Sequence, residues 1–384
     1  MPSTHALLSA SSSSRWLHCT PSAVWESKLE DQTSPYAEEG TKAHALAEKR
    51  LRHFLRYGKL LEDKPSYVEE EMWEATGRYV DIVIEKMTEA RRTSPDAQVL
   101  IEHRLDYSDW APLGFGTGDA VIVSDDGVEV IDLKYGKGVP VSAIGNSQMR
   151  LYALGAYADL SLVYELNRVT MTIVQPRLDS VSTETLTADE LLAWGRDVVV
   201  PRAQLAAKGK GEPEPGPHCK FCKKKPTCKA LGDYMMKKYE AARAQDPTDM
   251  TPEQIAQLVL GEKDLKGWLD AVSAYALEKA LEGKEWPGLK VVEGRSNRKL
   301  ADADEAARLL SENGYTDAAI YKPRELQTIT ALEKGIGKKA FAGILGDLIV
   351  KPKGKPTLVA DSDKRPAMAL DVPTKDDFDD SLLD

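Results

Sequence analysis

The stretch TGDAVIVSDDGVEVIDLKY (residues 117–135) decides the fold that we expect for this chain. It contains two runs rich in apolar and β-branched residues on either side of Asp125-Asp126-Gly127. Such runs around an Asp-Gly turn predict a β-hairpin, because these turn residues tolerate the tight backbone reversal that joins two antiparallel strands. We therefore expect strands at 117–123 and 128–135.

The hairpin brings three chemically active side chains together. With a loop at 125–126, Asp119 lies opposite Asp132. With a loop at 126–127, Asp119 lies opposite Lys134 instead. Because side chains alternate between the two faces of a strand, both registers put Asp119, Asp132 and Lys134 on one face.

The segments around the hairpin predict an α/β domain with a mixed central sheet flanked by helices. Further strands are expected at 98–104 and 169–175, with a helix from about 143 to 160 between the hairpin and the last strand. Other expected elements are a helix that Ser11 or Ser12 caps and that runs through Trp16, Cys19 and Val24, a helix from about Ala37, and a helix opened by the capping box Thr187–Glu190.

The length of 384 residues exceeds one ordinary domain. We expect an α/β domain at 1–236, a second, mainly α-helical domain at 237–360 and an acidic tail at 361–384. Thr251-Pro252-Glu253-Gln254 is a strong helix start in the second domain, where one short strand is expected at Leu289–Glu293.

Charge is segregated along the chain. The net charge of −10 hides a segment at 208–238 with nine lysines and three acidic residues, and a tail with eight aspartates and three basic residues. A basic working surface and an acidic, disordered tail are typical of such segregation. No apolar run approaches the roughly 18 residues of a membrane span, and no secretory signal is visible, so we expect a cytoplasmic location without a membrane partner. The stretch Gly335–Lys339 lacks P-loop spacing, so no ATP is expected.

Asp119 and Asp132 are expected to bind a metal ion. Two carboxylates at cross-strand distance repel each other unless a cation lies between them. Mg²⁺ accepts one or two carboxylates and keeps several waters, which suits this pair. Lys134 is placed to orient an attacking water and to offset charge in a phosphorane-like transition state. The ordinary alternative is a solvated hairpin with a surface ion pair.

Three further polar residues accompany the hairpin. His44 lies on the apolar stripe of its helix, where a histidine is either a core side chain or a metal ligand. Gln148 and Tyr152 are four residues apart and share one helical face. That face either contacts a substrate backbone or packs in the ordinary way.

The cysteines form a second candidate site. Cys219, Cys222 and Cys228 have the spacing C-x2-C-x5-C, and Cys19 lies near the start of the chain. Four thiolates can hold a tetrahedral Zn²⁺ or a cubane iron–sulfur cluster, and buried unligated cysteines are the ordinary alternative.

The segment around the last three cysteines adds two expectations. Lys220 and Lys223–Lys225 are expected to lower the pKa of the thiols and to attract phosphate. His218 adjoins the trio and is an alternative ligand.

The motifs of RecB-like nucleases are reproduced in order by Gly40-Thr41-Lys42-Ala43-His44, Gly118-x-Asp119, Asp132-x-Lys134 and Gln148-x-x-x-Tyr152. These nucleases belong to the PD-(D/E)XK superfamily. One cysteine before the first motif and three after the last resemble the subgroup with an iron–sulfur staple, which includes the AddB-type nuclease and CRISPR-associated RecB-like exonucleases. The resemblance covers roughly residues 9–232.

This resemblance implies a restriction-endonuclease-like core and a DNA exonuclease that depends on Mg²⁺ or Mn²⁺. It implies that the catalytic metal is bound by His44, Asp119, Asp132 and the Leu133 carbonyl. It also implies that Lys134 acts on the water and that Gln148 and Tyr152 contact DNA. The four cysteines would then hold a [4Fe–4S] cluster, with Zn²⁺ as the alternative.

The second half resembles an uncharacterised family of phage and prophage proteins, on the stretches Glu293–Lys299 and Lys351–Leu358. That resemblance implies a role in phage recombination in a bacterial host, beside a single-strand annealing or ssDNA-binding protein. The tail at 376–384 resembles the acidic tails of ssDNA-binding proteins and is either a docking motif or a solubilising tail. The alternative to a nuclease is a non-catalytic DNA-binding or scaffold protein with a structural zinc site.

Overall fold

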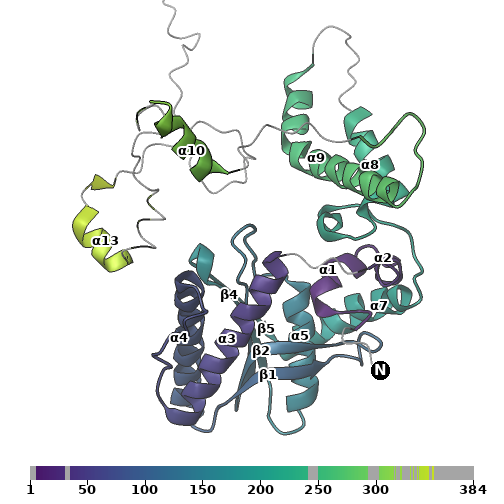
Figure 1. Cartoon of the computed structure of the whole chain (residues 1–384). Helices are drawn as coiled ribbons and strands as arrows, with labels where there is room; N and C mark the ends of the chain where they lie inside the picture. The colour runs from purple at the N-terminus through teal and green to yellow at the C-terminus, as the bar shows by residue number, and fades with distance from the viewer. Residues whose placement is uncertain are drawn as a thin grey trace, which may run out of the picture. The chain divides into compact units, whose positions relative to one another are not determined.

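The computed structural model describes residues 6–30, 35–240, 250–292, 302–314 and 337–345, with isolated positions between 316 and 349. The chain divides into two compact units. The first consists of residues 1–243 and 264–275, and the second of 244–263 and 276–384. The first unit contains the β-sheet, and the regular elements described in the second are helices (Figure 1).

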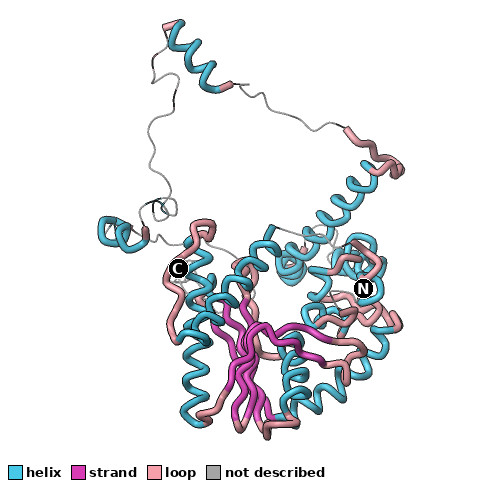
Figure 2. Tube along the Cα trace, turned by 60° about the horizontal axis from the view of Figure 1, so that its bottom comes forward, coloured by secondary structure: helices cyan, strands magenta, loops and turns pink. Residues whose placement is uncertain are grey.

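Five strands form one mixed sheet in the order β1-β2-β3-β4-β5 (Figure 2). Their bounds are β1 Gln98–Asp106, β2 Phe115–Ser124, β3 Gly127–Leu133, β4 Arg168–Gln175 and β5 Ser180–Thr187. β3 and β4 are parallel, and the other neighbouring pairs are antiparallel. Helix α5, Ser147–Leu160, lies in the connection between the two parallel strands, as a parallel pair requires. The expected α/β fold with a mixed sheet and flanking helices is confirmed.

The β2–β3 hairpin turns at Asp125 and Asp126. Ser124 pairs with Gly127, and the register continues to Ala120 and Ile131. The structure therefore has the first of the two expected loops, and the next positions along the register are those of Asp119 and Asp132. Apart from Glu129, every residue of β3 is buried, as expected for a strand covered on both faces.

Helices cover both faces of the sheet (Figure 1). α3, Pro35–Tyr57, and α4, Glu70–Thr93, pack against one face, where Tyr79 and Ile131 belong to one core cluster. Val130 belongs to a second and larger cluster, which α5 and the N-terminal segment share on the other face. The neighbours Val130 and Ile131 thus serve different clusters, because successive strand side chains point to opposite faces.

The expected opening helix needs correction. The structure has two short helices instead, α1 at Ser13–Trp16 and α2 at Ser22–Glu26. Ser12 makes no side-chain cap hydrogen bond. Pro21 separates the helices, because it has no backbone N–H with which to continue the first one.

Two elements have no counterpart among the expectations. β5 contains mainly Ser, Thr and Glu, with exposed and partly exposed residues in alternation, so it lacks an apolar pattern. α4 also lies outside the expected segments. The strand expected at Leu289–Glu293 is wrong, because residues 289–292 form no strand.

The capping boxes Thr187–Glu190 and Thr251–Gln254 are both formed. The remaining described elements are the 3-10 helices η1 Ala10–Ser12, η2 Pro176–Leu178, η4 Pro217–Phe221 and η5 Lys225–Thr227, the π-helical turn η3 Gly195–Val199, and the helices α6 Ala188–Trp194, α7 Val200–Ala207, α8 Lys229–Glu240, α9 Pro252–Leu281, α10 Ala303–Glu312 and α13 Lys338–Leu345. The stretches 293–299 and 351–358 and the tail at 361–384 lie outside the described residues.

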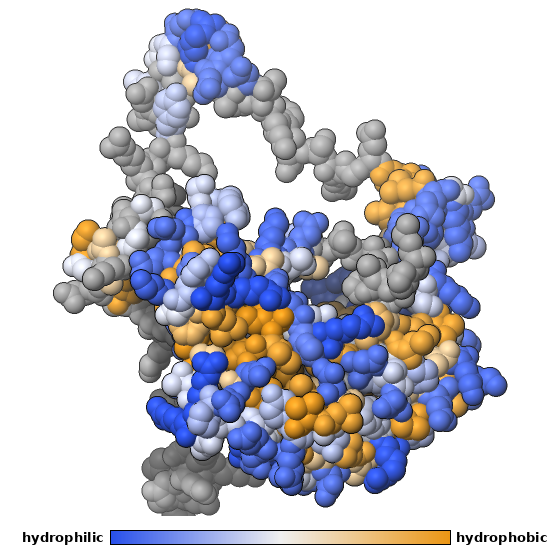
Figure 3. Space-filling model, turned by 90° about the horizontal axis from the view of Figure 1, so that it is seen from below, coloured by the Kyte–Doolittle hydropathy of each residue, from blue (hydrophilic) through white to orange (hydrophobic). Residues whose placement is uncertain are grey.

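Within the described part of the chain, no helix has both the length and the apolar character needed to span a bilayer. Apolar side chains nevertheless remain at the surface, and Figure 3 shows them as orange patches among blue charged groups on one face. Leu162 and Val163, in the turn after α5, are 87% and 80% exposed.

Leu154 within α5 and Leu162 in the turn after it predict contrasting effects on stability. Leu154 is fully buried in the larger core cluster, so Leu154→Ala is expected to lower the free energy of unfolding by about 2–5 kcal/mol through lost contacts and a cavity. Leu162→Ala, the exposed control, is expected to change it by less than about 0.5 kcal/mol. Urea denaturation followed by circular dichroism measures both, and equal effects would contradict the packing of α5 on the sheet.

Candidate functional site

The side chain of Asp119, on β2, contacts both β3 and helix α3. Its Oδ2 accepts the backbone N–H of Leu133 at 2.7 Å, and Nδ1 of His44 lies 3.0 Å from its Oδ1. The first contact crosses from β2 to β3, and the second reaches α3. The Asp119 side chain is only 13% exposed, so both contacts lie in a largely dry environment.

His44 reaches the sheet because α3 turns its apolar stripe toward the core. Ala47 and Leu51 on the same stripe are buried. Burial opposes protonation of the imidazole, but the hydrogen bond and charge of Asp119, together with the charge of Asp132, outweigh it and raise the pKa of His44. His44 therefore contacts a carboxylate and is more than a packed core side chain.

The buried Asp132 and the partly buried Lys134 form an ion pair, with 2.8 Å between Oδ2 and Nζ. Burial raises the pKa of Asp132 against the opposing charge of Lys134, and the charge of Asp119 adds to the rise. Burial also opposes the charge on Lys134, but the two carboxylates outweigh it and raise the pKa of the ammonium group. The lysine therefore stays charged although it is partly buried.

A chain of hydrogen bonds links Lys134 to α5. Its Nζ donates to Oε1 of Gln148 at 3.1 Å, and Nε2 of Gln148 donates to the Tyr152 hydroxyl at 3.3 Å. Asn146 caps the helix by accepting the backbone N–H of Gln148, which holds this first turn in place. Gly116 on β2 is needed here, because a Cβ at that position would lie 2.5 Å from the Tyr152 ring.

Glu102 belongs to the site but is not among the residues expected from the sequence. His44, Glu102 and Asp119 are the one group of three potential metal ligands in the described residues whose donor atoms all lie within 4.8 Å of one another. We refer to these three residues as the carboxylate–histidine group. The residues on either side of Glu102 in β1 pair with those on either side of Asp119. The sequence predicts a strand at 98–104, but the hairpin register relates only β2 to β3, so the alignment of Glu102 with Asp119 emerges only from the pairing of β1 with β2.

Glu102 is held in an unusual backbone conformation. Its φ is 51° in the middle of a strand, a left-handed value that costs a residue with a Cβ about 1–2 kcal/mol. Such strain is typical of functional sites. Burial raises the pKa of Glu102 to about 7, and the charges of Asp119 and Glu48 add to the rise. A proton or a cation is therefore needed to relieve the repulsion.

The donor set fits a divalent cation. Mg²⁺ lies about 2.0–2.1 Å from its ligands, which places neighbouring donors about 3 Å apart and opposite ones about 4 Å apart. The donor atoms of the carboxylate–histidine group, which all lie within 4.8 Å of one another, are near enough for such a site. The two carboxylates suit Mg²⁺ or Mn²⁺, whereas the imidazole suits softer divalent ions. Of the expected ligands, the structure thus brings His44 and Asp119 together, while Asp132 lies outside the group beside Lys134 and the backbone N–H of Leu133 bonds to Asp119.

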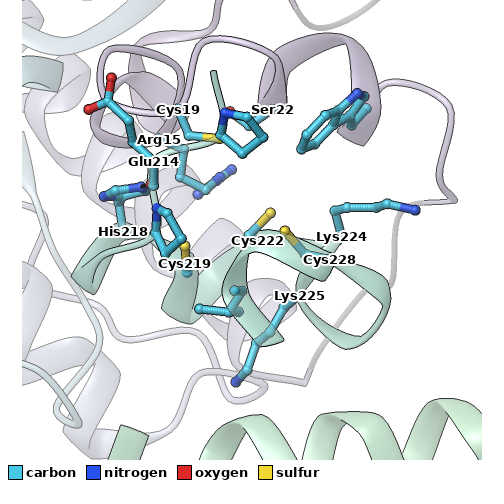
Figure 4. Close-up of a pocket in the computed structure, with 14 residues that line it drawn as sticks. Arg15, Cys19, Ser22, Glu214, His218, Cys219, Cys222, Lys224, Lys225 and Cys228 are labelled. Atoms are coloured by element: carbon cyan, nitrogen blue, oxygen red, sulfur yellow. Dashed lines mark hydrogen bonds between the residues drawn. The ribbon is translucent and has the colours of Figure 1, made fainter. Parts of the chain in front are cut away.

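The four cysteines converge on one small cavity. Cys19 lies between α1 and α2, and the other three lie in and beside η4 and η5. All four line a cavity of about 20 Å³, and Figure 4 shows their side chains arranged around this shared space. No three of their sulfur atoms lie within 4.8 Å of one another. A tetrahedral zinc site, with Zn–S bonds of about 2.3 Å, needs sulfurs about 3.8 Å apart.

Burial dominates the ionisation of these thiols. It raises the pKa of Cys19 and of Cys219, and it raises the pKa of Cys222 to about 12, where the charge of Glu26 adds to the effect. The expected effect of the neighbouring lysines is seen at Cys219, whose pKa the charge of Lys225 lowers, but burial outweighs it. The expected net lowering is therefore wrong for these three thiols.

Polar contacts attach the cysteine segment to the N-terminal helices. The buried Glu26 accepts the backbone N–H of Lys223 at 2.9 Å and Nε of Arg15 at 2.8 Å. The Thr20 hydroxyl donates to the carbonyl of Lys210 at 2.6 Å. These contacts hold Cys19 near the other cysteines without any bound group.

His218, the alternative ligand, is engaged elsewhere. Its Nε2 lies 2.7 Å from the carbonyl oxygen of Glu214, and its ring stacks on that of His18 with 5.0 Å between centroids. Its ring therefore belongs to the wall of the cavity, and the four sulfurs remain the candidate ligand set.

Comparison with protein families assigns the chain to one family. It belongs to the family of proteins of unknown function DUF2800, whose family model matches residues 5–366. The expectation that the chain belongs to an uncharacterised family is thus confirmed. A similar solved structure is described as "Crystal structure of SSO0001". It is 15% identical, and the match covers 57% of this chain and 96% of that chain with a TM-score of 0.21.

Glu102 predicts a pH-dependent stability. Its folded pKa of about 7 exceeds the ordinary 4.5, so the folded chain holds a proton that the unfolded chain releases between these values, and stability falls as the pH rises through this window. After a discount for its half-exposed position, Glu102→Gln is expected to stabilise the metal-free protein by about 1 kcal/mol at pH 8. Melting temperatures in EDTA at pH 5 and pH 8 measure this.

The same variant tests metal binding. Mn²⁺ is expected to raise the Tm of the wild type at pH 8 and to raise that of Glu102→Gln much less, because one ligand is lost. Glu85→Gln, at an exposed position on α4, is the matched control and is expected to behave like the wild type. An unchanged Mn²⁺ response in Glu102→Gln would remove this residue from the ligand set.

Proposed function

We propose that the first unit is a metal-dependent nuclease that hydrolyses phosphodiester bonds in DNA. The observation that carries the proposal is the ion pair of the buried Asp132 with Lys134 beside the carboxylate–histidine group. Phosphodiester hydrolysis needs both a cation site and a fixed positive charge, because negative charge develops on the phosphoryl oxygens while a water attacks. The order of the motifs, which resembles that of RecB-like nucleases, supports the same reaction.

In this proposal the carboxylate–histidine group and Asp132 hold the metal, with the Leu133 carbonyl as a further ligand. A bound Mg²⁺ or Mn²⁺ would supply Lewis-acid polarisation and a lower pKa for water. Lys134 is held by Asp132 and Gln148 at 2.8 Å and 3.1 Å, so its ammonium is fixed in position before substrate arrives. It orients the water and offsets charge on the transition state. The sheet with α3, α4 and α5 is the restriction-endonuclease-like core.

DNA is the substrate that the resemblance and the local charge favour. The segment at 208–238 combines nine lysines with three acidic residues, and such clusters bind phosphate backbones. Gln148 and Tyr152 contact the DNA in this proposal, and their hydrogen bonds to each other and to Lys134 couple that contact to the ammonium group. Exonucleolytic cleavage is the mode that the resemblance implies.

Asp132→Ala and Lys134→Ala are expected to lower cleavage of end-labelled linear DNA in Mg²⁺ or Mn²⁺ by at least about 100-fold, with DNA binding nearly intact. Gel electrophoresis measures cleavage and its polarity, and fluorescence anisotropy measures binding. Lys137→Ala, at an exposed lysine three residues further on, is the matched control. Wild-type turnover by Lys134→Ala would refute its role. DNA binding without cleavage by the wild type would favour the non-catalytic alternative.

We propose in addition that the four cysteines hold a [4Fe–4S] cluster. Their spacing is wider than a zinc site needs, and their split between the N-terminal segment and the end of the domain resembles the iron–sulfur staple. A bound cluster would supply a cross-link of four metal–thiolate bonds between these segments. Zn²⁺ is the alternative occupant.

Protein purified anaerobically is expected to be brown and to contain about four irons per chain. Cys19→Ser is expected to lose the iron and to lower the Tm of the domain, because the cross-link to α1 and α2 is lost. Asp132→Ala is the control and should keep its iron. Stoichiometric zinc without iron in the anaerobic preparation would select the zinc alternative.

We base the proposed biological setting on sequence resemblance alone. Processing of DNA ends in phage recombination, in the cytoplasm of a bacterial host, follows from the likeness at Glu293–Lys299 and Lys351–Leu358. A single-strand annealing or ssDNA-binding protein is the proposed partner, and the segment at 376–384 is its proposed docking motif, with a solubilising tail as the alternative.

A further inference from the structure

A cavity of about 490 Å³ lies beside the proposed catalytic site. Three segments that are far apart in the chain form its walls: the N-terminal segment at 11–18, the start of α5 at 145–148, and the region from α6 to α7. Gln148 lines the cavity and also accepts the hydrogen bond from Lys134 at 3.1 Å. The cavity and the catalytic site therefore share a wall.

The lining of this cavity favours an anion that also forms hydrogen bonds. Serine hydroxyls, two carboxamides, His18 and Arg202 line it, and no Asp or Glu is among its lining residues. Arg202 is oriented by Glu214, which lies outside the lining and whose Oε1 is 3.0 Å from its Nη1. The arginine fork has five donors in all and suits phosphate oxygens. Asn146 already caps α5, so these side chains, rather than the helix end, carry the selectivity.

The cavity also contains a fixed aromatic side chain. Trp194 lines it and packs against the larger core cluster, so the indole is held by the fold. Aromatic side chains are the surfaces on which unpaired bases stack in single-strand binding proteins, beside basic groups that follow the backbone. A volume of this size is in the range of small-molecule sites. A phosphate-binding arginine, hydroxyl donors and an indole together describe a site for one nucleotide.

We propose that this cavity is a subsite for one unpaired nucleotide of the DNA strand, adjacent to the phosphodiester that is cleaved. The inference rests on the proposed nuclease function and adds a strand specificity to it. Gln148 touches both sites, so a single strand that enters the cavity is led to Lys134. A paired base cannot stack on Trp194 without leaving its helix, so the subsite selects a single-stranded end.

Two variants test the subsite without touching the catalytic residues. Arg202→Ala removes the cation, and Ser14→Trp fills the cavity from an exposed serine on its wall. In an Asp132→Ala background, Arg202→Ala is expected to weaken binding of a fluorescein-labelled dT12 about five- to tenfold. It is also expected to reduce the slope of log K against log salt by about 0.7, the value for one phosphate contact on a single strand. Arg196→Ala, an exposed arginine paired with Asp197, is the matched control and should bind like its parent.

Steady-state kinetics distinguish a defect in the nucleotide subsite from a defect in the catalytic site. With otherwise native protein, both variants are expected to raise KM for dT12 at least about fivefold. Both should hydrolyse bis(4-nitrophenyl) phosphate, which has no nucleotide to occupy the cavity, at the wild-type rate. Wild-type KM and binding in both variants, with the wild type active, would overturn the subsite and leave the nuclease. An equal loss on the small diester would also overturn it.

The dT12 binding measurements test the nucleotide subsite even if the protein is not a nuclease. If the wild type cleaves neither substrate and dT12 binding still depends on Arg202 and on an open cavity, the nuclease is refuted and the nucleotide subsite is supported.

Discussion

The hydrogen bond from the Leu133 backbone N–H to the Asp119 carboxylate is the contact on which the candidate site depends. It ties β2 to β3 at the position where the paired register reaches Asp119 and Asp132. The same carboxylate contacts His44 at 3.0 Å, so the position of α3 over the sheet is coupled to the hairpin. A shift of one residue in this register would turn these side chains to the opposite face. The hairpin therefore determines both the core and the chemistry.

Electrostatic repulsion within a buried space is the second constraint. Burial raises the pKa of Asp132 and of Glu102, and the charge of Asp119 adds to both rises, while Lys134 stays charged beside Asp132. Glu102 also has a left-handed backbone. Buried carboxylates that repel one another add little stability, because an apolar strand interior is often at least as stable. A cation at this position relieves the repulsion, which is why the arrangement supports metal chemistry.

The cysteine cavity and the nucleotide-sized cavity share the N-terminal segment. His18 lines the larger cavity and stacks on His218, which lines the cysteine cavity. Glu26 and Thr20 attach this segment to residues about two hundred positions later in the chain. Closing so long a loop costs chain entropy on folding, and a cross-link that persists in the unfolded chain would reduce this cost. A cross-link at the cysteines would thus fix one wall of the proposed nucleotide subsite as well as the end of the domain.

The sequence alone determined the hairpin, the strand–helix–strand segment after it, the two capping boxes and the gathering of Asp119, Asp132 and Lys134 on one face. These features follow from local rules, because alternation, turn residues and helix caps act over a few positions. The family resemblance identified His44 before the structure placed it beside Asp119. Only the tertiary structure decided the loop at Asp125-Asp126, the break of the opening helix at Pro21 and the polar strand β5, whose pairing with β4 has no apolar signal. It alone also brought Glu102 to Asp119 and the N-terminal segment to α5. Both depend on contacts between segments that are distant in sequence, and on burial that a local pattern does not record.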